Sequence, residues 1–196
     1  MSNEQSPVGE LREALDLTGG LVSGVQPEQW SLPTPCTEWD VRQLVDHLVA
    51  GNQLFARVLG GEPFEEAMPA VRAVGDRLGD DAGAVYAASA RDLLAAFALP
   101  GVLERPVRVP FGTVPGAVAR HLRITECLVH GWDLARALGA SFDPPAALVE
   151  QELAFSGPML SQVPPERRVF APPQRTAGGG RPIERLVALL GRDTGA

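Results

Sequence analysis

One stretch constrains the fold of this chain more than any other: residues 120–137, RHLRITECLVHGWDLARA. Its pattern predicts one long helix. With 3.6 residues per turn, Glu126 and His130 lie about 40° apart and share one face of that helix. Small or apolar residues occupy the same face, namely Ala119, Leu122, Val129 and Ala137. Because a buried charge without a partner is costly, Glu126 and His130 require one.

Two interpretations of this pair remain open. An E-x3-H pair presents two ligands to a metal ion from one helix. Alternatively, Glu126 forms a buried hydrogen bond with His130 or His47 that only fixes packing, since acid–histidine pairs at this spacing are common on helices. His47, at the edge of an earlier apolar helix face, is the candidate third ligand, because facing helices of a bundle build metal sites. Two histidines and one carboxylate leave coordination positions open, as in catalytic sites.

Other polar and aromatic residues near the proposed ligands also have alternative interpretations. Asp133 either accepts a hydrogen bond from the His130 imidazole and orients it, or pairs with Arg136 at the surface. His121 lies about 180° from His130 around the helix and is interpreted as a surface or packing histidine. Trp39 and Trp132 either wall the site or pack in the core. Arginines on the same helix either steer an acidic substrate or, as is more usual, stay solvated; they are Arg120, Arg123 and Arg136.

The two cysteines, Cys36 and Cys127, raise a hypothesis of thiol chemistry. Cys36 precedes an expected helix N-terminus, where the helix dipole lowers the pKa of a thiol. Cys127 points about 100° away from Glu126. The alternative for both is a small buried or half-buried residue without a chemical role.

The remaining pattern predicts an all-α protein. Helices are expected over about 6–25 (beginning at Ser6-Pro7), 38–59 (with a capping box from Thr37 to Asp40), 67–78, 82–99 (capped by Asp80 or Asp81), 115–138, 144–160 and 181–190. Four of them have the length of bundle helices. Residues 102–116 break the helical pattern and predict a small extended excursion or hairpin before the fourth bundle helix. We expect one domain over residues 1–196, with a bundle core at about 7–139 and a short C-terminal helical extension at about 140–196.

Composition excludes several classes of function. The net charge of −7 argues against nucleic acid as a partner, because phosphate contacts need a basic face. All 17 basic residues are arginine, so a Schiff-base lysine and a P-loop lysine are excluded. We see no secretory signal, no membrane-spanning run and no disulfide framework. A reduced, cytoplasmic protein is therefore expected.

Three segments together resemble a known family: Thr34–Arg42 (TPCTEWDVR), Leu44–Leu48 (LVDHL) and Glu126–Leu134 (ECLVHGWDL). In combination they resemble the DinB-like superfamily. More closely, they are similar to its actinobacterial branch, the mycothiol-dependent maleylpyruvate isomerase N-terminal domain family and its short metal-binding relatives. The resemblance covers about residues 11–138 and the final segment 186–190.

The resemblance implies a DinB-like four-helix bundle with a divalent metal, usually Zn²⁺, held by one histidine of the second bundle helix and the E-x3-H pair of the fourth. The matching residues are His47, Glu126 and His130. Ni²⁺ and Fe²⁺ are alternatives. By this analogy the protein is a metal-dependent isomerase or transferase that uses a low-molecular-weight thiol, such as mycothiol, on a small electrophile.

The analogy has one departure and leaves two other functions open. The isomerase has a separate C-terminal α/β domain that this chain is too short to hold, so the isomerase activity itself stays open. The alternatives are a non-catalytic metal-binding or ligand-binding bundle and an iron oxygenase with two histidines and one carboxylate. The sequence is compatible with a monomer or a homodimer.

Overall fold

The computed structural model describes residues 8–162, 171–176 and 180–195. Helices dominate these residues. In chain order the elements are α1 (Gly9–Ser23), a short 3₁₀ helix (Pro27–Gln29), α2 (Val41–Leu59), α3 (Phe64–Arg72), α4 (Ala82–Phe97), β1 (Pro106–Val109), β2 (Gly112–Pro115), α5 (Gly116–Leu138), α6 (Ala146–Gln162) and α7 (Pro182–Leu189).

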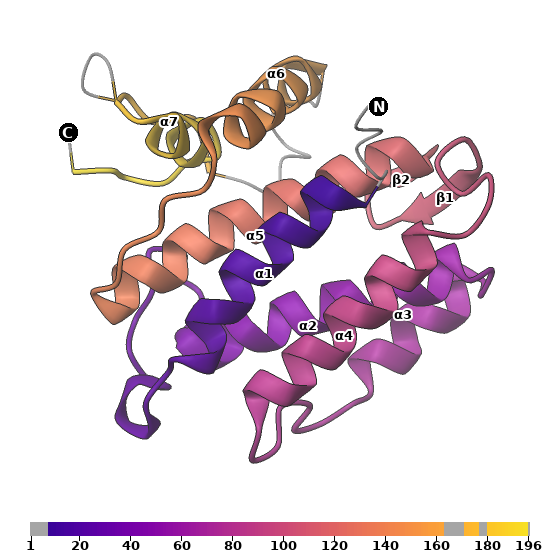
Figure 1. Cartoon of the computed structure of the whole chain (residues 1–196), viewed down its shortest axis with the longest axis horizontal. Helices are drawn as coiled ribbons and strands as arrows, with labels where there is room; N and C mark the ends of the chain where they lie inside the picture. The colour runs from indigo at the N-terminus through magenta and orange to yellow at the C-terminus, as the bar shows by residue number, and fades with distance from the viewer. Residues whose placement is uncertain (1–7, 163–170, 177–179, 196) are drawn as a thin grey trace, which may run out of the picture.

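Four helices, α1, α2, α4 and α5, form a bundle (Figure 1). Helix α1 packs against α4 and α5, and α2 packs against the same two helices, so the bundle closes around one core. Apolar residues at helical spacing fill that core, among them Leu11, Leu15, Leu44, Leu48, Leu93, Phe97, Ile124 and Leu128. The prediction of an all-α protein built on a four-helix bundle is confirmed.

The start of α2 corrects one prediction. Asp40, not Thr37, is the N-cap: its carboxylate accepts from the Gln43 amide at 2.8 Å, and its own amide donates to Gln43 Oε1 at 3.0 Å. This reciprocal pair is a capping box. Thr34 instead donates to the Trp39 carbonyl at 2.7 Å, which keeps residues 34–39 in a loop before the helix.

Other predicted boundaries shift by a few residues. Helix α3 occupies Phe64–Arg72, earlier than the expected 67–78. Asp81 caps α4 as predicted, since its carboxylate accepts from the Ala84 amide at 2.8 Å. The predicted start of the first helix at Ser6-Pro7 lies outside the described residues.

The predicted excursion is a two-stranded antiparallel hairpin, in which Val107 pairs with Val114. It connects α4 to α5 and packs against α2 and α5. Gly116, the first residue of α5, approaches the preceding loop so closely that a Cβ there would lie 1.9 Å from the Val102 carbonyl oxygen. A glycine is therefore required where the hairpin turns into α5.

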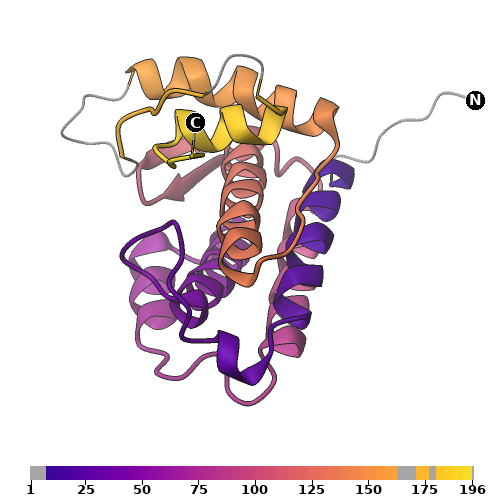
Figure 2. The ribbon, with the colours of Figure 1, turned by 90° about the vertical axis from the view of Figure 1, so that its left-hand side faces the viewer.

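The C-terminal helices α6 and α7 pack against each other and against α5, outside the bundle (Figures 1 and 2). Helix α5 is consequently covered by the bundle on one side and by this extension on the other. From Arg123 to Ala135, every residue except Glu126 is buried. The organisation of residues 1–196 as one domain stays a prediction. Among the described residues, no helix is both long enough and apolar enough to cross a membrane.

Candidate metal centre

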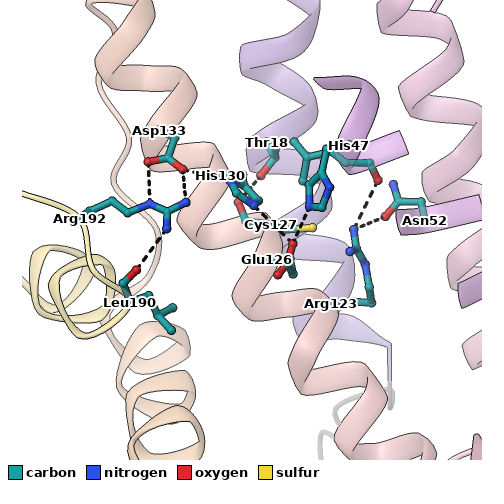
Figure 3. A network of polar contacts seen from close by, with 11 residues as sticks. Thr18, His47, Asn52, Arg123, Glu126, Cys127, His130, Asp133, Leu190 and Arg192 are labelled. Carbon is teal, nitrogen blue, oxygen red and sulfur yellow. Dashed lines mark hydrogen bonds and ion pairs between the residues drawn. The ribbon is translucent and has the colours of Figure 1, made fainter. Parts of the chain in front are cut away.

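Three of the residues predicted from the sequence come together between α2 and α5 (Figure 3). Nε2 of His47, from α2, lies 3.0 Å from Oε2 of Glu126 in α5. Nε2 of His130, one turn further along α5, lies 3.4 Å from the same oxygen. Glu126 therefore stands between two imidazole rings whose centroids are 5.1 Å apart.

These separations match the geometry of a metal site. Two ligand atoms bound tetrahedrally to Zn²⁺ at about 2.1 Å lie roughly 3.4 Å apart. One ligand atom from each of His47, Glu126 and His130 can be chosen so that all three lie within 4.8 Å of one another. The exposed fraction falls from 36% for the His47 side chain to 19% for Glu126 and 4% for His130. One side of the triad therefore reaches solvent.

The hydrogen bond between His130 and Asp133 determines which ring nitrogen of His130 carries the proton and which one faces Glu126. His130 Nδ1 lies 3.0 Å from Asp133 Oδ2, so Nδ1 carries a proton. In a neutral ring Nε2 is then unprotonated and faces the Glu126 carboxylate, an arrangement of two acceptors. A second proton on the ring or a cation between the two atoms resolves this conflict. The residues present thus fit a divalent cation.

The electrostatics of the cluster favour charged side chains despite burial. Burial raises the pKa of Glu126, but hydrogen bonds from His130 and His47 outweigh it and hold that pKa well below its usual value. Burial likewise lowers the pKa of His130, but Asp133 and Glu126 reverse the direction and raise it. A carboxylate that stays ionised in a half-buried site is a suitable ligand for a cation.

Asp133 has a partner that sequence reasoning missed. The carboxylate of Asp133 is fully buried and contacts Arg192, which follows α7: Nη2 lies 2.8 Å from Oδ2, and Nε lies 3.2 Å from Oδ1. Burial raises the pKa of Asp133, but His130 and Arg192 together lower it below its ordinary value. Of the two predicted roles of Asp133, the contact with His130 is the one observed. No local pattern connects residues 133 and 192.

The two tryptophans predicted to wall the site or to pack in the core, Trp39 and Trp132, differ in their contacts. The Trp39 ring packs on His47, with centroids 4.3 Å apart, and lies 5.8 Å from the His130 ring, so it walls the triad. Trp132 is buried, and the guanidinium of Arg136 lies over its ring at 5.6 Å from the centroid. Arg136 therefore contacts Trp132, whereas Asp133 contacts His130 and Arg192.

Arg123 does not follow the expectation of a solvated arginine. It is 2% exposed, lies over the Phe55 ring, and donates to Asn52 Oδ1 at 2.9 Å and to the Leu48 carbonyl at 3.4 Å. Gly51 makes room for it, because a Cβ at that position would lie 2.5 Å from Arg123 Nη1. This guanidinium joins α5 to α2 inside the bundle.

The cysteines are not activated in the way that the helix-dipole hypothesis predicted. Helix α2 begins at Val41, five positions after Cys36, so the thiol does not cap it. Burial is the main cause that raises the pKa of Cys36. Cys127 is fully buried, and burial raises its pKa to about 11. Both observations agree with the alternative of small buried or half-buried residues.

His121 is a packing histidine, which is one of the two alternatives predicted for it, the other being a surface histidine. Its ring stacks on Phe155 of α6 with centroids 4.6 Å apart. Its Nδ1 lies 2.8 Å from an oxygen of Glu152, a fully buried carboxylate that also accepts from Thr125. His121 therefore connects α5 to α6, away from the triad.

Comparisons with known proteins agree with this architecture. Two curated relatives are uncharacterized proteins of Mycobacterium tuberculosis, from strains CDC 1551 / Oshkosh and ATCC 25618 / H37Rv. Each is 33% identical over 187 residues, which cover 95% of this chain and 97% of the relative.

Solved structures of a mycothiol-dependent maleylpyruvate isomerase and of its histidine-to-alanine variant are also similar, with TM-scores of 0.56 and 0.58 at 18% and 16% identity. The matches cover 74% of this chain and 66% of the isomerase, so the chain spans just under two thirds of that protein's length. At this identity the likeness shows a shared fold. Residues 11–135 match the family model described as the mycothiol maleylpyruvate isomerase N-terminal domain. This chain therefore belongs to the mycothiol maleylpyruvate isomerase N-terminal domain family.

Proposed function

We propose that this protein binds a divalent metal ion through His47, Glu126 and His130, and that it uses the metal with a low-molecular-weight thiol of the mycothiol type to isomerise or transfer a small electrophile. The observation that carries the proposal is the convergence of His47 and His130 on one oxygen of Glu126, at 3.0 and 3.4 Å. Zn²⁺ suits two imidazoles and one carboxylate, and Ni²⁺ and Fe²⁺ accept the same ligands.

The protein's own residues prepare this site for a cation. In a neutral His130 ring Asp133 keeps the proton on Nδ1, so that the Nε2 lone pair faces the centre. Glu126 contributes the negative charge, and the Trp39 ring packs on the His47 ring with centroids 4.3 Å apart. A bound divalent cation supplies Lewis acidity, or lowers the pKa of a coordinated water or thiol. His47 is the most exposed of the three proposed ligands, at 36%, so a small molecule would reach the centre from that side.

Family membership supports the choice of a thiol as co-substrate. The matching family and the similar solved structures are both described as mycothiol-dependent or mycothiol isomerases. Neither cysteine of this chain offers a thiol with a lowered pKa, since burial raises the pKa of both. A nucleophilic thiolate would therefore come from a small molecule that enters the open side of the site.

Metal analysis of the purified protein tests the binding step. We expect about one divalent ion per chain, and its loss in His47→Ala, Glu126→Ala and His130→Ala variants that remain folded by circular dichroism. His121→Gln is the matched control, because His121 also lies on α5 but contacts Glu152. Full metal occupancy in the His47→Ala variant would overturn the proposal.

A turnover assay tests the chemistry. The zinc-loaded protein is incubated with mycothiol and maleylpyruvate, followed by a panel of other small electrophiles. We expect thiol-dependent turnover that a chelator abolishes and that added Zn²⁺ restores. Metal occupancy without turnover on any electrophile would contradict the enzymatic part and favour a non-catalytic metal-binding bundle.

A further inference from the structure

Arg192 reaches the candidate metal centre from a part of the chain that lies beyond the family match at residues 11–135. It follows α7 and is 8% exposed. Its Nε and Nη2 contact the two carboxylate oxygens of Asp133 at 3.2 and 2.8 Å, and its Nη1 donates to the Leu190 carbonyl at 3.1 Å (Figure 3). Two parallel bonds of this kind fix the plane of a carboxylate, not only its distance.

The backbone places Arg192 through a defined helix end. The Gly191 amide donates to the Ala188 carbonyl at 3.0 Å, and the Arg192 amide donates to the Val187 carbonyl at 2.9 Å. These two bonds are those of a Schellman motif, in which a left-handed residue ends the helix. Gly191 has φ of +87°, as that motif requires. The direction in which Arg192 leaves α7 is therefore set by the turn.

The contact continues through Asp133 to a proposed metal ligand. Oδ2 of Asp133 lies 2.8 Å from Arg192 Nη2 and 3.0 Å from His130 Nδ1. The carboxylate that Arg192 holds accepts a hydrogen bond from His130 Nδ1, and in the same ring orientation Nε2 lies 3.4 Å from Oε2 of Glu126. Arg192 also neutralises the buried charge of Asp133, so that the negative charge of Glu126 is left to balance that of the cation.

We propose that Arg192 is a positioning residue of the metal centre, which holds Asp133 so that Asp133 orients the His130 imidazole for metal binding. The C-terminal extension is then part of the centre and not an appendage to the bundle. This inference rests on the proposed metal site, and it assigns no contact between Arg192 and the metal.

Zn²⁺ affinity, measured by competition with a chromogenic chelator, tests the inference. We expect Asp133→Asn to weaken Zn²⁺ binding about 10- to 100-fold and Arg192→Gln about 10-fold, in the range typical of residues that orient metal ligands. Because Arg192 acts through Asp133, the double variant should bind no more weakly than Asp133→Asn alone. The visible spectrum of the Co²⁺ form should change in Arg192→Gln, which a purely structural role would not cause.

Arg185→Gln is the matched control, because Arg185 lies on α7, the helix that Arg192 follows, and pairs with Glu150 of α6, outside the site. It should keep wild-type affinity and the wild-type Co²⁺ spectrum. Wild-type affinity in Arg192→Gln, or an effect that adds fully to that of Asp133→Asn, would overturn the inference. If Arg192→Gln does not fold, Arg192→Lys carries the same test, since it keeps the charge but loses the paired bonds. A wild-type protein that binds none of Zn²⁺, Ni²⁺ and Fe²⁺ would instead refute the proposed function.

Discussion

Nε2 of His47 and Oε2 of Glu126 lie 3.0 Å apart, although 79 residues separate them in the chain. The contact joins the middle of α2 to the middle of α5. In the absence of a cation it is a hydrogen bond that fixes one helix against the other. With a cation bound, the same two side chains would hold the helices through metal–ligand bonds, so metal binding and bundle stability are coupled.

Zinc should therefore raise the melting temperature. A ligand that binds only the folded state at 100 times its dissociation constant adds about 2.7 kcal/mol of stability. For a chain of this size that corresponds to roughly 5–10 °C. Differential scanning calorimetry with and without Zn²⁺ measures the shift, which a chelator should reverse. The His47→Ala variant should show little shift; an increase equal to that of the wild type would contradict a metal held by His47.

Asn52 should be important for stability because it satisfies a buried guanidinium. Its side chain is fully buried, accepts from Arg123 at 2.9 Å and donates to Ser89 of α4 at 3.1 Å. We expect Asn52→Ala to lower the free energy of unfolding by about 2–3 kcal/mol, since it leaves a buried charge short of an acceptor. Ser89→Ala should cost only about 1 kcal/mol. Urea titrations compare them, and equal costs would show that Arg123 does not depend on Asn52.

Gly131, next to His130, should not tolerate a side chain. A Cβ there would lie 2.6 Å from the Phe142 ring and 3.0 Å from the Thr18 hydroxyl. We expect Gly131→Ala to destabilise the protein by about 1–3 kcal/mol through overpacking. Gly20→Ala, in α1 with nothing within 4 Å of the added Cβ, should be neutral or stabilise the helix by up to about 1 kcal/mol. Thermal unfolding of both variants measures these changes. A Gly131→Ala protein that is more stable than the wild type would show that the Phe142 ring and the Thr18 hydroxyl move away from the added Cβ without cost.

Thiol labelling should be slow in the folded protein at neutral pH. Only a thiolate reacts, and burial raises the pKa of Cys36 and brings that of Cys127 to about 11. Labelling of Cys36 by iodoacetamide should therefore accelerate as the pH rises above the ordinary thiol range, while Cys127 should react only after unfolding. Mass spectrometry of the wild type and of Cys36→Ser distinguishes the two sites. Rapid labelling of Cys36 at pH 7 would restore the hypothesis of an activated thiol.

The sequence alone was sufficient to predict the helix that carries the site. A 3.6-residue period determines which side chains share a face, and this is why Glu126 and His130 could be paired and His121 set apart. The hairpin was predicted because alternation and proline at residues 106–110 break that period. Thr37 and Asp40 both suit the N-cap of α2 in the sequence, and only the observed backbone selects Asp40.

The tertiary structure alone decided the surroundings of that helix. Periodicity describes positions around one axis and carries no information on what packs against each side. Helices α6 and α7 cover the outer face of α5, and this burial places Asp133 against Arg192 and leaves Arg136 on Trp132. Arg123, expected in solvent, faces α2 because Gly51 leaves it space. Contacts between segments distant in sequence depend on how whole helices pack, and a local pattern does not contain them.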